Sequence, residues 1–359
     1  MKSVFLVKTP LQLLNAIEAR HHYELKKQDC VVILMADRKS QKQLRNLAQA
    51  VDEWGDVLDL NDAPLLFLDP LKNVNADSLF NNFWKLKIFN RSIFYVHRLN
   101  RISKCLGEVE YFFVGYARYV YMKHLVNITP HRKIVSLDDG NATLELAKER
   151  GFSPNNIKSL PLKKKIKLFL RKYIQGLNSN EFSRLEFFTI YNIDLDRKDS
   201  LVKHNFSYLK SRIENISRTE EVYFIGSPLS ETGIVSKSSL LENLKRVKSY
   251  YKGKNIVYIS HRRESEINLK EISRELGMKV IQFEYPIEYQ LAMKGPRPVV
   301  LASFISSALD SCSLIFGDTM RVVAFRLDLV DSPRQDEINS IYDSYESDNN
   351  SKVVVESNY

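Results

Sequence analysis

The sequence predicts an α/β protein with two successive layered domains and a cleft between them. Short apolar runs of strand length alternate with segments of helical periodicity, which is the pattern of mostly parallel sheets. This pattern occurs in two series, separated by a basic and polar stretch. The 359 residues suit two domains of ordinary size. We expect one domain at residues 1–215, with a basic excursion at about 152–215, a second at 216–332, and an acidic tail at 333–359.

The first series begins with an apolar run followed by Thr9-Pro10, a turn that suits the start of a helix. Residues Leu11, Leu14 and Ile17 then recur at roughly helical spacing. A further helix is expected at residues 41–50, and another from residue 144. The expected strands of this series are residues 3–7, 30–35, 65–68, 111–114 and 134–137.

The second series contains the clearest amphipathic helix, at residues 239–251, with Leu240, Leu244 and Val247 on one side. Other helices are expected at 264–276 and 287–293, with a helical turn at 304–309. The expected strands are residues 221–225, 255–260, 279–283, 299–302, 314–316 and 322–327.

The overall composition is that of a globular protein, with 44% hydrophobic and 27% charged residues. Cys30, Cys105 and Cys312 are few and widely spaced, which predicts free thiols and a reducing cytoplasm. The apolar run at residues 4–7 is too short for the core of a signal peptide. No window approaches the roughly 18–20 apolar residues that span a bilayer. We therefore expect a soluble or peripheral protein.

The formal net charge of +10 is unevenly distributed. Residues 155–176 hold seven lysines and arginines and no acid, with apolar residues interleaved. A basic amphipathic helix of this kind suits an anionic membrane surface, although a solvated helix packed on a core has the same pattern. A second basic stretch at 85–104 is expected on the same surface, whereas the chain after Pro333 is acidic.

Two carboxylates follow a predicted strand directly, in the stretch Asp138-Asp139-Gly140-Asn141. The carboxyl ends of parallel strands face the ligand crevice of an open sheet. Adjacent carboxylates repel each other, which raises the apparent pKa of one of them and makes it a usable base. Gly140 would let the backbone turn sharply. The alternative is a simple turn in which Asp139 or Asn141 caps the next helix.

Three further groups follow strands of the second series. His261 is followed by Arg262 and Arg263, a combination suited to a phosphate. Ser306 and Ser307 lie at a predicted helix start, where hydroxyl and free N–H groups bind anions. Glu284 and Glu288 offer carboxylates to a ribose or a base amine, or are surface charges.

Several motifs are absent. The sequence has no Gly-x-Gly-x-x-Gly and no Gly-Lys-Ser/Thr loop, which argues against dinucleotide and P-loop functions. Cysteine and histidine pairs with zinc spacing are also missing. Asp194-Leu195-Asp196 resembles the metal-binding pair of diphosphate-sugar transferases, but it does not follow a clear strand. The sequence gives no strong metal site.

Taken together, these motifs resemble those of bacterial sialyltransferases, in particular the lipooligosaccharide sialyltransferase and polysialyltransferase families. Asp138-Asp139-Gly140 matches their acidic-acidic-Gly motif, His261 stands where they carry His-Pro, and Ser306-Ser307 stand at their serine pair. The segments 8–16 and 224–229 resemble these families as well, so the likeness covers about residues 3–316. Arg262 replaces the expected proline, which puts the shape of that loop and the donor preference in question.

The resemblance implies a GT-B glycosyltransferase with two Rossmann-like domains, an active site in the interdomain cleft and a CMP-activated sialic acid as donor. Asp138 would deprotonate the acceptor hydroxyl, with Asp139 in support, and His261 would act on the CMP phosphate. No metal and no other cofactor would be required, because a single phosphate can be stabilised by protein donors. Expected donor-side residues are Ser306, Ser307, Glu284, Glu288, Gly226, Ser227 and Arg262, and expected acceptor-side residues are Thr9, Pro10, Gln12, Gly140 and Asn141.

The leading hypothesis is therefore an inverting, metal-independent sialyltransferase that extends a bacterial lipopolysaccharide, lipooligosaccharide or capsule. It would act in the cytoplasm on a lipid-linked acceptor, at the inner face of the inner membrane, through residues 155–176. A homodimer stays open. One alternative keeps the fold and uses CMP-Kdo or another CMP-nonulosonate. The other, a basic nucleic-acid-binding protein, lacks any RRM, KH or zinc signature, so we expect no nucleic acid partner.

Overall fold

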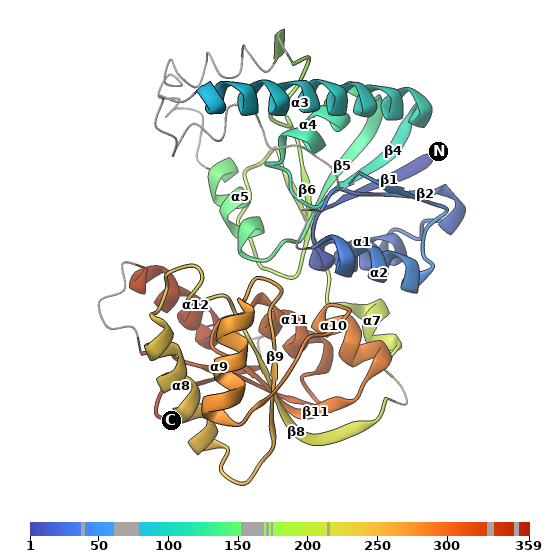
Figure 1. Cartoon of the computed structure of the whole chain (residues 1–359). Coiled ribbons are helices and arrows are strands. Elements are labelled where there is room, and N and C mark those ends of the chain that lie inside the picture. The colour runs from blue at the N-terminus through green and yellow to red at the C-terminus, as the bar shows by residue number, and fades with distance from the viewer. Residues whose placement is uncertain are drawn as a thin grey trace. The chain divides into compact units, whose positions relative to one another are not determined.

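In the computed structural model the chain forms two compact units, Met1–His204 and Asn205–Tyr359 (Figure 1). The structure describes residues 1–36, 40–60, 79–151, 169, 172–173, 175–213, 216–328, 334–347 and 352–359, with the backbone alone for 79–90, 337 and 347. The units divide between His204 and Asn205, where we expected a boundary near residue 215. The short helix α7 (Ser207–Ser211) therefore opens the second unit.

The described residues of the first unit form a seven-stranded sheet in the order β3-β2-β1-β4-β5-β6-β7, in which every neighbouring pair is parallel. The predicted strands are confirmed except 65–68, which lies outside the described residues. β6 and β7 come from the stretch that we interpreted as a basic and polar excursion, so that interpretation is wrong for these residues. The strands are β1 (Lys2–Val7), β2 (Cys30–Leu34), β3 (Asp56–Asp59), β4 (Val109–Val114), β5 (His131–Leu137), β6 (Glu186–Thr189) and β7 (Ser200–Lys203).

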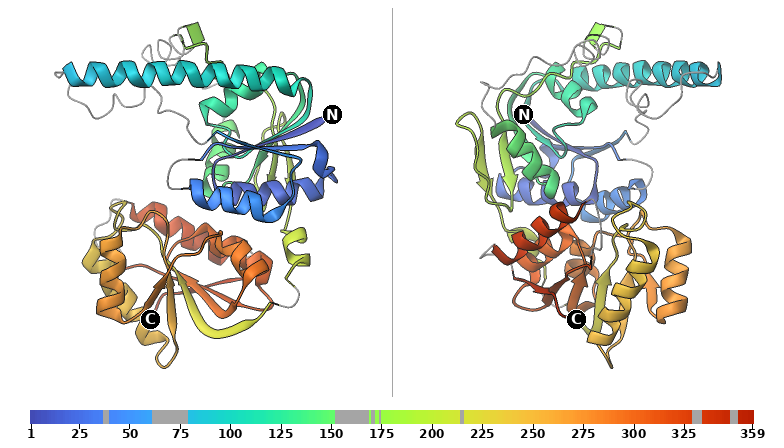
Figure 2. Two further views of the ribbon diagram at one scale, coloured as in Figure 1. Left: turned by 45° about the vertical axis from the view of Figure 1, so that its right-hand side comes forward. Right: turned by 90° about the vertical axis from the view of Figure 1, so that its left-hand side faces the viewer.

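Helices cover both faces of this sheet (Figure 2). Because side chains alternate along a strand, Val4 and Leu6 of β1 pack in one core cluster with Leu99, Tyr121 and other residues. Phe5 faces the opposite side and stacks on Phe113, with ring centroids 4.3 Å apart. The helices are α1 (Pro10–His22), α2 (Gln41–Val51), α3 (Leu79–Leu106), α4 (Val120–Ile128) and α5 (Asn141–Gly151).

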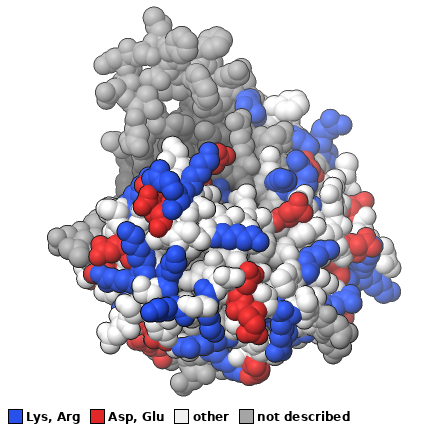
Figure 3. Space-filling view, turned by 60° about the horizontal axis from the view of Figure 1, so that its bottom comes forward, with Lys and Arg blue, Asp and Glu red and all other residues white. Residues whose placement is uncertain are grey.

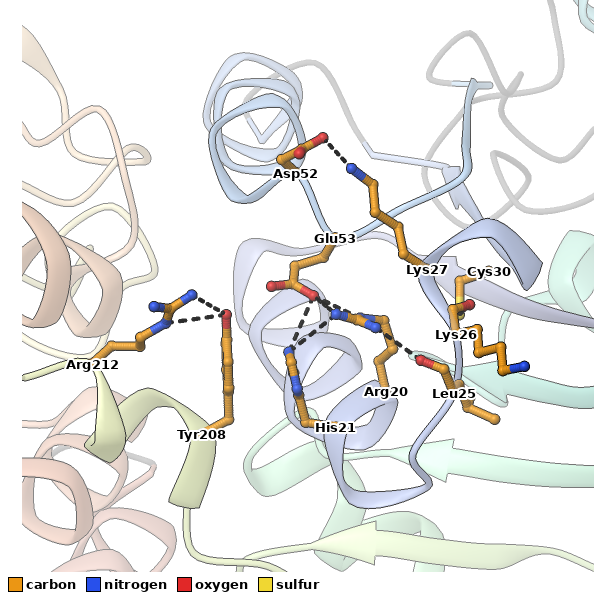
Figure 4. Close-up of polar contacts among 10 residues, drawn as sticks. All are labelled: Arg20, His21, Leu25, Lys26, Lys27, Cys30, Asp52, Glu53, Tyr208 and Arg212. Carbon is orange, nitrogen blue, oxygen red and sulfur yellow. Dashed lines mark hydrogen bonds and ion pairs between the residues drawn. The ribbon is translucent and has the colours of Figure 1, made fainter.

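Ion pairs fasten the carboxyl-terminal end of α1 (Figure 4). Arg20 donates from Nε to Oε2 of Glu53 over 2.6 Å, and Nε2 of His21 lies 3.1 Å from the same oxygen. Glu53 is buried, and it precedes β3. Arg20 also donates to the carbonyl oxygen of Leu25. These contacts hold α1 in place, and its opposite end carries the Thr9-Pro10-Leu11-Gln12 segment.

In the second unit, the part of the chain that the structure describes forms a six-stranded parallel sheet in the order β10-β9-β8-β11-β12-β13. The strand predicted at 314–316 is wrong, because these residues end helix α11. The strands are β8 (Arg218–Ile225), β9 (Ile256–Ile259), β10 (Lys279–Ile281), β11 (Arg297–Ser303), β12 (Arg321–Phe325) and β13 (Val353–Glu356). The helices are α8 (Lys237–Tyr250), α9 (Glu266–Leu276), α10 (Ile287–Tyr289) with the π-helical turn Gln290–Lys294, α11 (Ser307–Phe316) and α12 (Gln335–Ser347).

The chain after Pro333, which we expected to be an acidic tail, belongs to the second unit. β13 pairs with β12 at the edge of the sheet. In α12 the side chains of Ile338, Tyr342 and Tyr345 are buried at helical spacing. The hydroxyl of Tyr342 donates to the carbonyl oxygen of Phe325 over 3.0 Å. Of its acidic residues, Asp336, Asp343 and Glu346 are exposed, on the other side of this packed helix.

Candidate active site

The predicted carboxylate pair lies at the carboxyl edge of the first sheet. Asp138 and Asp139 follow β5 directly, and Thr189 ends β6, the neighbouring strand. Thr9 lies just after β1, which pairs with β4, and β4 in turn pairs with β5. Parallel strands bring these ends to one edge, so residues far apart in the sequence surround the pair.

Asp138 is held by four hydrogen bonds and is 2% exposed. Its Oδ1 accepts from the backbone N–H of Gly140 over 2.7 Å and from the Thr143 hydroxyl over 3.3 Å. Its Oδ2 accepts from the Thr189 hydroxyl over 2.6 Å and from the N–H of Ile190 over 3.1 Å. Burial raises the pKa of Asp138, and these hydrogen bonds oppose the rise. Both carboxylate oxygens accept hydrogen bonds, so Asp138 joins the turn between β5 and α5 to the end of β6.

Asp139 has fewer contacts and is only partly buried. Its Oδ1 accepts from the Thr9 hydroxyl over a long 3.4 Å, while its own N–H donates to the Thr143 hydroxyl over 2.7 Å. Burial raises the pKa of Asp139 to about 6, and the neighbouring charge of Asp138 adds to the rise. A partly exposed carboxyl with this pKa is ionised at neutral pH and basic enough to accept a proton.

The Thr9 to Gln12 segment forms the amino-terminal cap of α1. The Thr9 hydroxyl accepts from the Gln12 N–H, and the Gln12 side chain accepts from the Thr9 N–H, with Pro10 in the first turn. Gln12 Oε1 also accepts from the Lys8 N–H over 2.7 Å. The buried Gln12 amide lies close enough to Asp139 to lower the pKa of that carboxyl, although its Nε2 has no hydrogen bond of ordinary geometry. This cap therefore forms one wall beside Asp139.

Two glycines are required at this edge. Gly140 has φ +65°, a left-handed conformation that costs other residues energy, and it lets the chain turn from Asp139 into α5, which Asn141 begins. Gly115, at the end of β4, lies against Gln12, and a Cβ there would come within 2.3 Å of Oε1 of Gln12. The sequence predicted the turn at Gly140 but not the role of Gly115.

The predicted donor-side residues lie at the carboxyl edge of the second sheet. Gly226 and Ser227 follow β8, His261 follows β9 after one residue, and Ser306 follows β11 after two. β8 lies between β9 and β11, so the three loops are neighbours. The sequence placed each residue at a strand end, and the strand order brings them to one edge.

Serine side chains tie two of these loops together. The Ser227 hydroxyl donates to the carbonyl oxygen of Ile305 over 2.5 Å, and Ser303 donates to that of Ile225 over 2.8 Å. Ser306 caps α11, since its hydroxyl accepts from the Ala308 N–H over 3.2 Å. Ser307 is the first residue of α11 and is exposed. The amino terminus of α11 thus offers N–H and hydroxyl donors to an anion.

His261 lies in a turn with Arg262, Arg263 and Glu264, and its side chain is partly exposed. The Glu264 N–H donates to the carbonyl oxygen of His261 over 3.0 Å, which closes the turn. Sequence reasoning missed Glu264, although its position three residues after the histidine is the spacing that lets a side chain reach back across a turn. It also missed Thr143 and Thr189, which hold Asp138.

The two candidate glutamates differ in exposure. Glu284 is exposed, beyond the end of β10. Glu288 in α10 is 4% exposed, and its Oε1 accepts from the Ser311 hydroxyl of α11 over 2.6 Å. Burial raises the pKa of Glu288. Glu288 thus links α10 to the first turns of α11, next to Ser307.

In the first unit, a cavity of about 780 Å³ lies along α3 and residues of β1, β2 and β3, away from the carboxyl edge of that unit's sheet. Apolar residues such as Val31, Leu58 and Ile102 line it, together with the basic residues Lys2, His97, Arg98 and Arg101. It includes none of the predicted site residues. Within the part of the chain that the structure describes, no group of three or more potential metal ligands occurs.

Comparison with solved structures supports the fold. The structure is similar to that of an α/β-galactoside α-2,3-sialyltransferase from Photobacterium phosphoreum, with a TM-score of 0.50 and 11% sequence identity. The match covers 98% of this chain and 98% of that one. A Photobacterium 2,6-sialyltransferase in complex with CMP and lactose has a TM-score of 0.51 and 11% identity, over 99% of this chain and 78% of its own. An S. aureus MnaA–UDP structure has a TM-score of 0.52 and 11% identity, over 97% of this chain and 89% of its own. At such identities these likenesses show the GT-B fold alone.

The family comparison is decisive for the enzyme class. No curated protein sequence matches the chain. The family model described as alpha-2,8-polysialyltransferase (POLYST) matches residues 3–323, which include both carboxyl edges described above. This span exceeds half of the 359 residues, and it agrees with the predicted resemblance. The chain therefore belongs to the alpha-2,8-polysialyltransferase family and is a glycosyltransferase of the sialyltransferase type.

Proposed function

We propose that this protein is an inverting, metal-independent sialyltransferase that moves sialic acid from CMP-sialic acid to a hydroxyl of a bacterial surface glycan. The observation that carries the proposal is the partly exposed Asp139 at the carboxyl edge of the first sheet, in a chain of the polysialyltransferase family. The pKa of Asp139, about 6, suits a general base at neutral pH.

The two carboxylates have different roles in this proposal. Asp139 takes the proton of the acceptor hydroxyl while the oxygen of that hydroxyl forms a bond to the anomeric carbon of the donor. At the same time the bond between the anomeric carbon and the CMP phosphate oxygen breaks. Asp138 holds the loop, because four hydrogen bonds occupy its two oxygens. This reverses the roles that the resemblance implied. Attack from the face opposite the leaving group inverts the anomeric centre.

The second unit supplies the donor side. His261, Ser306, Ser307 and the amino terminus of α11 stabilise the negative charge that develops on the CMP phosphate. The hydrogen bonds from Ser227 to Ile305 and from Ser303 to Ile225 support this assignment, because they hold the neighbouring loops in a fixed arrangement. Such fixed donors reduce the need for a metal ion.

Glu284 and Glu288 both remain candidates for the cytidine contact. Glu284 is accessible, whereas Glu288 lies beside the phosphate-side helix α11. The variants Glu284→Gln and Glu288→Gln distinguish the two candidates. Substitution of the residue that binds cytidine should raise the Kd for CMP and leave the Kd for inorganic phosphate unchanged, whereas substitution of the other residue should not.

We propose that the acceptor is lipid-linked and that the protein contacts an anionic membrane through residues 155–176. Only Phe169, Lys172, Tyr173, Gln175 and Gly176 of this segment are described. Phe169 and Tyr173 are 59% and 66% exposed, and Lys172 lies over the Tyr173 ring at 5.4 Å. Exposed aromatic and basic side chains together suit the headgroup region of a bilayer. No helix among the described residues has the length and apolarity to cross a membrane.

A nucleic-acid-binding function is the weaker candidate. On the face of the protein shown in Figure 3, Lys and Arg side chains are interspersed with Asp and Glu. A polynucleotide is bound instead by a concentrated basic surface. The family match over residues 3–323 favours sugar transfer over this function.

The test is turnover of CMP-sialic acid in the presence of EDTA, with galactosides and sialylated galactosides as acceptors. The proposal predicts CMP release that requires an acceptor and is lost in Asp139→Asn and His261→Ala. CMP binding without sialoside formation would redirect the proposal to CMP-Kdo or another CMP-nonulosonate. Loss of turnover with EDTA, restored by a divalent cation, would refute metal independence.

A further inference from the structure

The turn after β9 contains a partly buried carboxylate that the proposed chemistry does not use. Glu264 accepts the backbone N–H of His261 at Oε2 over 2.6 Å. Its other oxygen, Oε1, accepts from the Tyr258 hydroxyl over 2.6 Å. The side chain therefore ties the backbone at His261 to strand β9.

The same turn determines how the imidazole is protonated. The Arg263 N–H donates to Nδ1 of His261 over 3.2 Å. An imidazole nitrogen that accepts a hydrogen bond carries no proton, so the neutral ring has its proton on Nε2. That nitrogen is then a donor for a phosphate oxygen. Because Glu264 accepts the His261 N–H, it holds the backbone of this turn at the residue that carries the imidazole.

The neighbouring strand leaves room for this carboxylate only because residue 226 is glycine. A Cβ on Gly226 would lie 2.4 Å from Oε2 of Glu264 and 2.7 Å from the Tyr258 hydroxyl oxygen. Any larger residue would displace the carboxylate from His261. Gly226 was predicted as a donor-side residue, and this contact gives it a distinct role.

We propose that Glu264 is a positioning residue for donor binding, which holds the 261–264 turn so that His261 presents its Nε2 proton to the CMP phosphate. The inference rests on the proposed function for its ligand, CMP. Glu264 acts through an acceptor oxygen and not through its charge. Burial raises the pKa of Glu264 to about 7, with Glu231 adding to the rise, so both protonation states are populated at neutral pH. The protonated carboxyl keeps a carbonyl oxygen that can accept the His261 N–H.

The variants follow from this geometry. Glu264→Gln keeps an acceptor oxygen of the same reach, whereas Glu264→Ala removes it. Gly226→Ala displaces the carboxylate without altering it. Glu266→Gln is the matched control, because Glu266 is an exposed acid two residues further along the chain.

Two measurements test the proposal, and the first needs no ligand. With labelled histidine, NMR of the ligand-free protein reports the tautomer of each of the seven histidines, and His261→Asn identifies the relevant signal. We expect Nε2–H at His261 in the wild type, Glu264→Gln and Glu266→Gln, and a mixture of tautomers in Glu264→Ala and Gly226→Ala. The second measurement is the Kd for CMP by calorimetry, which we expect to rise about tenfold to a hundredfold in the latter two variants and less than about threefold in Glu264→Gln.

The outcomes separate this inference from the proposed function. If the wild type binds no CMP, the proposed function fails, while the tautomer measurement still decides whether Glu264 positions His261. An unchanged tautomer in folded Glu264→Ala would overturn the positioning role. The positioning role would also be overturned if Glu264→Gln changed the tautomer and the Kd for CMP as much as Glu264→Ala does. In that case the charge of Glu264, and not its acceptor oxygen, would be what matters.

Discussion

Substitution of the two adjacent aspartates should separate catalysis from stability. Asp139→Asn removes the proposed base from a partly exposed position and leaves the loop contacts of Asp138 intact. General-base catalysis contributes roughly 10²–10⁴ in rate, so kcat should fall by about that factor. The melting temperature should stay within about 1–2 °C of the wild type, because the hydrogen bond that Asp139 accepts from Thr9 is long at 3.4 Å and the neutral amide removes the cost of partly burying a charge.

Asp138→Asn should instead destabilise the first unit. Its amide group can replace only one of the two carboxylate oxygens, so its NH₂ must face either the N–H of Gly140 or that of Ile190. A buried donor left without a partner costs about 1–3 kcal/mol. The substitution also removes a buried charge, which offsets part of this loss, so we expect about 1 kcal/mol and a melting temperature lower by about 2–4 °C.

Initial rates at saturating donor, with scanning calorimetry of the same preparations, measure both effects. Asp139→Asn with wild-type kcat would refute the role of Asp139 as the base. A large loss of kcat in Asp138→Asn, with an unchanged melting temperature, would show that Asp138 is the base and that the hydrogen-bond argument is wrong.

Three further predictions follow from the described contacts. The base must be ionised, so kcat/KM should fall about tenfold per pH unit below the Asp139 pKa of about 6; a pH-independent rate down to pH 5 would contradict this. Arg150→Ala should lower the free energy of unfolding in urea by about 3–5 kcal/mol, because the carboxylate of Asp199, whose side chain is 0% exposed, loses its bidentate partner. A loss below about 1 kcal/mol would contradict a buried ion pair. Deletion of residues 334–359 should unfold the second unit, which loses β13 and α12, and retained CMP binding by the shortened chain would show that these elements are dispensable.

The position of the carboxylate pair could be predicted because it depends on local sequence. An apolar run followed by two acids and a glycine predicts the end of the strand and the turn after it. The division of labour between Asp138 and Asp139 could not be predicted, because it is set by Thr189 and Ile190, about 50 residues further on. Only the pairing of β5 with β6 brings them to Asp138.

The errors in the fold have a similar origin. The run at 314–316 looks like a short strand because α11 is buried on several sides, with Ser311, Cys312, Ser313 and Ile315 all inside. A buried helix loses the one-sided pattern by which a surface helix is identified. The acidic stretch after Pro333 did contain a helical stripe, Ile338, Tyr342 and Tyr345, but the charge of the intervening residues obscured it.

The central claim, transfer of sialic acid from CMP to a glycan hydroxyl, is tested most directly by the product. The purified enzyme, CMP-sialic acid and a sialylated galactoside would be incubated with EDTA, and acceptor and CMP followed together by mass spectrometry and NMR. The account predicts one sialyl residue added for each CMP released, with the anomeric configuration inverted. CMP release without a sialylated acceptor, or a product of retained configuration, would contradict it.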